Sequence, residues 1–174
     1  LADHHLNVLH LHLSDDQGWR FEVPAYPRLT AVGARREATQ RGHGPQATVE
    51  PGVHEGFYST AELRELVRYA DDRAVTLVPE VELPGHIQAA LAAYPELGNL
   101  DVSAPAAGPW ERFGVNPRTL APTEASLAFG RAAIDALCDV FTSEWIGIGG
   151  DEVPVTEWAQ SPAAASRMAE LGLA

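Results

Sequence analysis

Three stretches of the chain alternate bulky apolar residues with polar or small ones at a period of two, which is the pattern of a β-strand. The first two, residues 6–13 and 75–83, each have one apolar face and one largely polar face. In the third, residues 145–150, isoleucines alternate with glycines, so that one face can pack while the other is bare. The pattern therefore predicts three strands. The charged or titratable side chains on the polar faces are His10 and His12 in the first strand, and Glu80 and Glu82 in the second.

Apolar residues at helical spacing predict α-helices between and after these strands. A capping box at residues 59–62 begins a helix that runs to about residue 73. An alanine-rich helical piece follows residue 87, and a last helix covers residues 161–172. Thr123 caps the helix that precedes the third strand. Its buried stripe is expected to contain Ile134, Leu137, Cys138 and Phe141.

Residues 21–56 interrupt this succession of strands and helices. They contain several prolines and glycines and no long periodic segment. We therefore expect an irregular connection with one short helix over residues 26–33. The connection is long for a loop, and long loops tend to carry function or disorder.

The order strand, helix, strand, helix, strand, helix favours a parallel α/β sheet with right-handed crossovers. The polar inner faces of the first two strands favour a barrel over an open sheet, because the central strands of an open sheet would be apolar on both faces. A complete (β/α)8 barrel takes about 250 residues, whereas this chain supplies about three βα units. We therefore expect residues 1–174 to be a fragment of a single (β/α)8 TIM barrel domain.

Composition and charge narrow the possible partners. The 174 residues include 12 basic and 24 acidic ones, and a net charge of −12 argues against nucleic acid or an anionic membrane surface. A neutral or cationic ligand fits better. Cys138 is the single cysteine, which excludes a disulfide framework and a cysteine-rich metal site. No apolar run approaches the roughly 18 residues of a membrane span. The N-terminus carries no signal-peptide pattern. The sequence does not determine whether the compartment is cytoplasmic or secreted.

Polar groups gather where each predicted strand ends. Asp15 and Asp16 follow the first strand, His86 follows the second, and Asp151 and Glu152 follow the third. Parallel α/β folds bind ligands at the carboxyl ends of their strands, and the glycines before Asp151 leave the backbone open to close approach. A site is therefore expected there. The alternative is that the two adjacent acids form only a solvated turn.

Four segments resemble the motifs of a known family. Residues 6–20, 56–60, 78–86 and 148–154 look like glycoside hydrolase family 20, the β-N-acetylhexosaminidases, in the same order and across nearly the whole chain. The resemblance implies a (β/α)8 barrel, of which this chain is the part from about the second strand to the fourth helix. It also implies hydrolysis of terminal N-acetylglucosamine or N-acetylgalactosamine from glycans or chitooligosaccharides, with retention of configuration and without a separate cofactor.

The resemblance implies roles for four residues. The two carboxylates of an ordinary retaining glycosidase stand about 5 Å apart, on opposite sides of the scissile bond. Two residues adjacent in sequence do not obviously reach opposite sides of the bond. If the sugar's own 2-acetamido oxygen is the nucleophile, a second carboxylate on the opposite side is not required. Asp151 would orient the acetamido group, while Glu152 would protonate the leaving oxygen and then activate water, which calls for an anionic neighbour and partial burial. His86 and Asp15 would form a hydrogen-bonded relay with Glu152, the alternative being that His86 only caps a turn.

Further residues are candidates for substrate contacts or for support of the site. Trp19 and Tyr58 are candidate substrate contacts, and Trp110 and Trp158 could also stack on sugar rings, although a core or rim position is commoner for tryptophan. Gly147 departs from the family, which often has histidine there, and leaves a gap that water or a neighbour must fill. The remaining polar residues are expected to be interior supports that bond one another: Asp16, His10, His12, Glu80 and Glu82.

Several parts of the family's pocket have no counterpart in this sequence, among them a first-strand arginine, later tryptophans and the tyrosine that holds the acetamido oxygen. The isolated chain is therefore expected to be weakly active or inactive. Two rival interpretations remain. One is a metal-dependent amidohydrolase-like barrel with His10, His12, His86 and Asp151 as ligands, although such enzymes draw further histidines from later strands. The other is a non-catalytic sugar-binding remnant.

Overall fold

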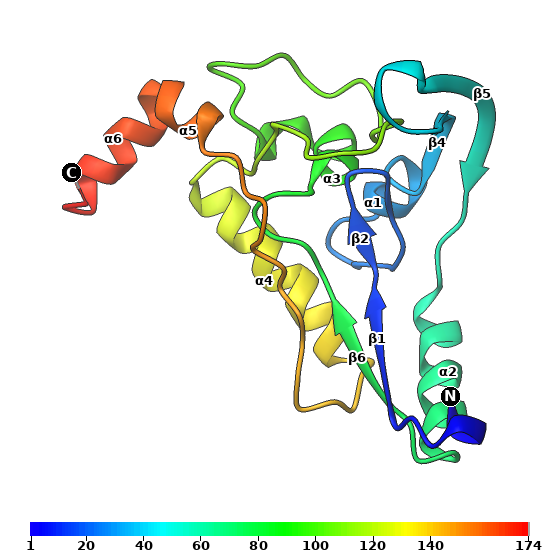
Figure 1. Cartoon of the computed structure of the whole chain (residues 1–174). Coiled ribbons are helices and arrows are strands. Elements are labelled where there is room, and N and C mark those ends of the chain that lie inside the picture. The colour runs from blue at the N-terminus through cyan, green and yellow to red at the C-terminus, as the bar shows by residue number, and fades with distance from the viewer. Residues whose placement is uncertain (174) are drawn as a thin grey trace.

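Two parallel strands, β1 (Val8–His12) and β6 (Thr76–Glu80), lie side by side at the centre of the computed structural model, which describes residues 1–173 (Figure 1). Their register pairs Leu9 with Leu77 and His12 with Glu80. Successive side chains of a strand point to opposite faces, so the leucines share one face and the polar residues the other. The first two predicted strands are confirmed.

A third segment runs parallel to β6 on the edge opposite β1. The amide of Gly147 donates to the carbonyl of Pro79 at 2.9 Å, and the carbonyl of Gly147 accepts from the amide of Val81 at 3.0 Å. The predicted third strand is confirmed only in part. The structure has a single bridge between Glu80 and Gly147 there, and one further backbone hydrogen bond from the Leu83 amide to the Ile148 carbonyl at 3.1 Å. The backbone turns at Gly149, where φ is 62°, so the segment leaves the sheet soon after the bridge.

Two long helices connect the three parallel segments. Helix α2 (Thr60–Asp71) links β1 to β6, and α4 (Glu124–Cys138) precedes the third segment; Figure 1 shows them on opposite sides of the two strands. Both predicted N-caps are confirmed. The Ser59 side chain accepts from the amide of Glu62 in a full capping box, and the Thr123 side chain accepts from the amide of Ser126.

The other elements are short. The chain begins with a 3-10 turn (Ala2–His4), and β1 leads into a small antiparallel hairpin of β2 (Ser14–Asp15) and β3 (Gly18–Trp19). The expected short helix and alanine-rich piece appear as α1 (Arg28–Ala31) and α3 (Gln88–Ala93). The expected last helix is α6 (Pro162–Glu170), capped by Ser161. The remaining elements are the 3-10 turns Gly44–Gln46 and Pro95–Leu97 and the helix α5 (Thr156–Gln160).

The long connection after β3 is not irregular throughout, as the sequence suggested. It contains an antiparallel hairpin of β4 (Arg35–Arg41) and β5 (Thr48–Glu55), which lies at the upper right of Figure 1, beyond the carboxyl ends of the parallel strands. The hairpin is mostly exposed and has no apolar face, and its register shifts between Arg36 and Ala38. Hydrophobic alternation therefore gives no sign of it, because backbone pairing holds the two strands together.

The core lies between the leucine face of the strands and the surrounding helices. The Trp19 ring centroid is 4.8 Å from that of Phe21 and 5.7 Å from that of Phe129 on α4. Large aromatic rings contribute much of the apolar area that a core buries, so Trp19 anchors the turn after β1 to α4. The largest fully buried side chains also include Leu29, Leu63, Ile87, Leu137 and Val81.

The buried stripe of α4 differs in part from the predicted one. Leu137 and Phe141 are buried as expected, but Ile134 is only half-buried and Cys138 is exposed. Successive helical residues are about 100° apart around the axis, so residues 134 and 138 each stand one step beyond the buried positions. The stripe that is present consists of Ser126, Phe129, Gly130, Ala133 and Leu137.

The described residues thus form an α/β unit with three adjacent parallel strand segments. Within residues 1–173 these segments do not close into a barrel. No helix in this range combines the length and the apolar character that crossing a bilayer requires.

Candidate active site

His86 lies at the centre of a cluster of carboxylates beyond the carboxyl ends of the strands. Its Nδ1 is 3.3 Å from Asp15 Oδ1 and 3.2 Å from Asp16 Oδ2, while its Nε2 is 3.5 Å from Glu152 Oε2. The structure thus brings Asp15, His86 and Glu152 together in the order carboxylate, imidazole, carboxylate. Burial alone would lower the pKa of His86, but the carboxylates of Asp15 and Asp16 outweigh it and raise this pKa.

Asp16 contacts His86 directly, which the sequence did not predict. Its side chain is completely buried, and Oδ1 accepts the backbone amide of Gln88 at 2.9 Å. Burial raises the pKa of Asp16, against the stabilising effect of that hydrogen bond. Asp16 is therefore an interior support, as expected, and also a second partner of the His86 ring. The only sequence feature that points to this contact is the position of Asp16 directly after Asp15. That feature does not reveal which of the two acids is buried.

The backbone at His86 and Glu152 adopts the left-handed conformation. The φ angles are 48° and 49°, and these are two of four non-glycine residues with positive φ among residues 1–173. Such a conformation costs about 1–3 kcal/mol per residue and tends to occur at functional sites. The 3.5 Å approach of the two side chains therefore depends on an unfavourable backbone that the surrounding structure maintains.

Asp151 and Glu152 line one open cleft of about 660 Å³ together with Asp15, His86 and Glu82. The other wall comes from two segments that the sequence did not assign to the site. One is the β4 strand of the polar hairpin, and the other is the loop of residues 111–115. The two segments are joined, because Gln40 donates its backbone amide to the Glu111 carbonyl at 2.8 Å. Arg36 and Arg112 bring positive charge to this otherwise acidic cleft.

Glu152 and Asp151 are more exposed than the expected chemistry requires. The Glu152 side chain is 58% exposed, and Asp151 is also on the surface. The partial burial expected for Glu152 is therefore not provided by residues 1–173.

Trp19 was wrongly proposed as a substrate contact. It is 1% exposed, and its Nε1 donates to the carbonyl of Phe21 at 2.8 Å. This is the core position that is commoner for tryptophan. Tyr58 is 50% exposed, but it lines a separate hollow with Arg20 and His54. Trp158 donates its Nε1 to the Leu120 carbonyl at 2.8 Å, away from the cleft.

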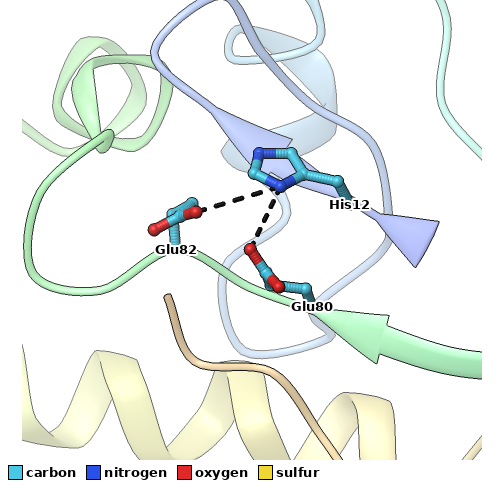
Figure 2. Close-up of side chains that lie close together, drawn as sticks. All are labelled: His12, Glu80 and Glu82. Carbon is cyan, nitrogen blue, oxygen red and sulfur yellow. Dashed lines mark ion pairs between the residues drawn. The ribbon is translucent and has the colours of Figure 1, made fainter. Parts of the chain in front are cut away.

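A second cluster lies just below the first, on the polar face of the strands. Figure 2 shows the carboxylates of Glu80 and Glu82 facing the same nitrogen of the His12 ring, with Nδ1 at 3.1 Å from Glu80 Oε1 and 3.8 Å from Glu82 Oε1. His10 Nε2 pairs with the other oxygen of Glu80. Glu82 is 4% exposed, and its burial together with the nearby Glu80 carboxylate raises its pKa to about 7. The expected bonding among these interior residues is confirmed for these four side chains.

The glycines of the third segment make room for these glutamates. A Cβ at Gly147 would stand 2.6 Å from Glu80 Oε2, and one at Gly149 would stand 1.8 Å from Glu82 Oε2. The gap expected at Gly147 is therefore filled by a neighbour, the Glu80 side chain. The bare face predicted for this segment is the face against which the two glutamates lie.

Replacing Gly149 by alanine is expected to lower the free energy of unfolding by about 2–5 kcal/mol. A positive φ costs an L-residue about 1–2 kcal/mol, and overpacking against Glu82 adds about 1–3 kcal/mol. Gly42→Ala is the matched control, because φ is 75° there but a Cβ would meet nothing within 4 Å. Urea denaturation of both variants separates the two effects, and equal losses would show that Glu82 does not occupy the space beside Gly149.

The metal-dependent interpretation is wrong in its ligand set. Within residues 1–173 the side chains close enough to share an ion form two groups, and neither contains His10 or Asp151. In both groups the carboxylates already pair with the imidazole, which accounts for the clustering without an ion. The two groups are His12 with Glu80 and Glu82, and His86 with Asp15 and Asp16.

Parallel strands joined by helices, with acids and a histidine gathered in a cleft at the carboxyl ends of the strands, are the arrangement of α/β enzymes. Comparison with known families identifies the family within this class. Residues 1–174 match the model of the glycosyl hydrolase family 20 catalytic domain from end to end. The chain belongs to this family.

Named relatives agree with this membership. The chain is 37% identical over 169 residues to a β-hexosaminidase of Porphyromonas gingivalis and 36% identical over 175 residues to one of Vibrio furnissii. The two matches include 97% and 99% of this chain, but only 20% and 28% of the respective relatives. The chain thus spans less than a third of these relatives.

Solved structures give the same result. A β-N-acetylhexosaminidase crystal structure matches with a TM-score of 0.86 at 34% identity, covering 99% of this chain and 35% of that one. The exo-β-N-acetylglucosaminidase of Vibrio harveyi, solved in complex with N-acetylglucosamine, matches with a TM-score of 0.80 at 32% identity over 99% of this chain and 27% of that one.

Proposed function

We propose that the chain is part of the catalytic domain of a β-N-acetylhexosaminidase, which removes terminal N-acetylglucosamine or N-acetylgalactosamine from glycans or chitooligosaccharides with retention of configuration. The observation that carries this proposal is the line of Asp15, His86 and Glu152 at 3.3 and 3.5 Å in the cleft that Asp151 also borders. Among the relatives, one is named an N,N'-diacetylchitobiase and one structure holds N-acetylglucosamine.

In this proposal the sugar supplies its own nucleophile. The 2-acetamido oxygen attacks the anomeric carbon, Asp151 orients the acetamido group and stabilises the charge on its nitrogen, and Glu152 protonates the leaving oxygen. Glu152 then removes a proton from the water that opens the oxazolinium-like intermediate. The hydrogen-bonded His86 ring tunes the proton affinity of Glu152 as the glutamate loses and regains its proton. Asp15 holds that ring in place. No metal or cofactor enters these steps.

We also propose that the three parallel segments are consecutive strands of a (β/α)8 barrel. The polar face with His10, His12, Glu80 and Glu82 would point into the barrel, where layers of side chains fill the interior. Relatives several times longer than this chain leave room for the other strands. The remaining wall around Glu152 would come from those strands.

The isolated chain is expected to hydrolyse a chromogenic N-acetylglucosaminide weakly or not at all. The cleft is open to solvent, and the side chain of Glu152 in it is 58% exposed. A steady-state assay of the 174-residue protein tests this expectation. Ordinary turnover would mean that the described cleft is a sufficient site and would overturn the incomplete-site proposal.

Binding tests the proposed site without requiring turnover. A thiazoline inhibitor that mimics the oxazoline intermediate is expected to bind weakly by calorimetry or ligand-observed NMR, and Asp151→Asn and Glu152→Gln are each expected to weaken it further. Asp135→Asn on the exposed face of α4 is the control for loss of one negative charge. Equal binding by all variants would remove the cleft as the sugar site.

A further inference from the structure

We propose that His12 is a positioning residue, which holds the Asp15 carboxylate in place against His86 and so orients His86 toward Glu152. This inference rests on the proposed function, because it gives the relay a support that none of the relay residues supplies. His12 Nε2 is 3.3 Å from Asp15 Oδ2, and the other Asp15 oxygen, Oδ1, is 3.3 Å from His86 Nδ1. The Asp15 carboxylate thus bridges two imidazole rings.

Asp15 needs such a support because little else restrains it. Its side chain is 36% exposed and stands at the end of the two-residue strand β2. Oδ1 accepts the backbone amide of Asp16 at 2.6 Å, which fixes one oxygen. Oδ2 is held by His12 alone among the contacts of residues 1–173. Removing His12 would leave the carboxylate free to rotate about that single anchor.

His12 is itself held firmly enough to serve this purpose. Its Nδ1 is 3.1 Å from Glu80 Oε1 on the neighbouring strand, and Glu80 is mostly buried and also pairs with His10. His12 therefore joins the strand interior to the cleft.

Two substitutions separate the Asp15 side of the His12 ring from the Glu80 side. In His12→Gln the side-chain amide lies where Nε2 was and still donates to Asp15, whereas in His12→Asn it lies where Nδ1 was and donates only to Glu80. Both replace the imidazole by a neutral amide. The charged groups facing His86 stay in place in both variants: Asp15, Asp16, Glu82 and Glu152.

The test is the pH titration of the His86 ring by NMR in the 174-residue protein. A loosened Asp15 stabilises the charged ring less, so the His86 midpoint is expected to be lower in His12→Asn than in His12→Gln by on the order of half a pH unit. Adding Asp15→Asn to both variants is expected to abolish that difference. His10→Gln, which touches Glu80 but not Asp15, is the control and is expected to leave the midpoint unchanged.

Two results would overturn the proposal. Equal midpoints in His12→Asn and His12→Gln would show that Asp15 does not depend on His12. A difference that persists with Asp15→Asn would show that His12 acts on His86 without Asp15. The titration is independent of catalysis, so failure of inhibitor binding would reject the proposed function while leaving the positioning role intact. Circular dichroism of each variant verifies that it folds, and His12→Gln provides a second folded reference.

Discussion

Replacing Trp19 by alanine is expected to lower the free energy of unfolding by about 3–5 kcal/mol, the usual cost of deleting a buried tryptophan. The ring is 1% exposed and packs on Phe21 and Phe129, so its removal leaves a cavity between the turn after β1 and helix α4. Urea denaturation measures the loss. At low temperature, where the variant is folded, its affinity for the thiazoline inhibitor should remain close to that of the wild type. Any apparent loss of affinity should be no larger than the unfolded fraction of the variant explains.

Trp145→Ala is the matched control for this prediction. Trp145 is 73% exposed, and exposed substitutions usually change stability by less than about 0.5 kcal/mol. Trp19→Phe keeps most of the ring packing and loses the hydrogen bond to the Phe21 carbonyl, so an intermediate loss of about 1–2 kcal/mol is expected. A stable Trp19→Ala protein that no longer binds the inhibitor would instead restore Trp19 as a substrate contact.

Stability is expected to fall as the pH rises from about 4.5 to 7, because of Glu82. The folded protein raises the pKa of this carboxyl from 4.5 to about 7, through burial and the neighbouring Glu80. The folded state therefore keeps a proton that the unfolded chain releases, and its contribution is complete below pH 4.5 and lost as the pH passes 7. A difference of this size corresponds to about 3 kcal/mol. The raised pKa of His86 acts in the same direction above pH 6.5.

Glu82→Gln isolates this contribution. A glutamine amide can donate to Glu80 as the protonated carboxyl does but does not titrate, so the variant is expected to be more stable than the wild type at pH 8 by up to about 3 kcal/mol. Below pH 4.5 the two proteins should be similar. Glu65→Gln on the exposed side of α2 is the control. Identical pH profiles of unfolding for Glu82→Gln and the wild type would contradict the prediction.

Strands and helices with a buried face could be predicted from the sequence, because burial imposes a period on the residues. The leucines of β1 and the Ser59 capping box both identify their elements correctly. The β4–β5 hairpin has no buried face, and its strands are defined by backbone pairing that any polar residue can provide. The hydrophobic pattern therefore could not predict that this hairpin contributes Arg36 and Gln40 to the cleft wall.

The position of each acid within the site could be predicted only in part. Placement of acids and histidine after three successive parallel strands predicts that they meet, and Asp15, His86 and Glu152 do. Which of two adjacent aspartates is buried depends on the amide of Gln88, seventy-two positions away in the chain. The core position of Trp19 likewise depends on α4, which follows more than a hundred residues later. Such contacts come from tertiary packing and leave no local signal.

The arrangement of the parallel segments has a consequence for behaviour in solution. Strand β1 and the segment around Gly147 each pair with β6 on one edge, and among the described residues neither has a partner on its other edge. Val8 and Ile148, on these two segments, are also exposed apolar side chains. Unpaired backbone donors and acceptors template the addition of another strand. The isolated unit is thus prone to self-association along both edges, and a separately produced polypeptide that supplies the neighbouring strands of the proposed barrel should suppress this by complementation.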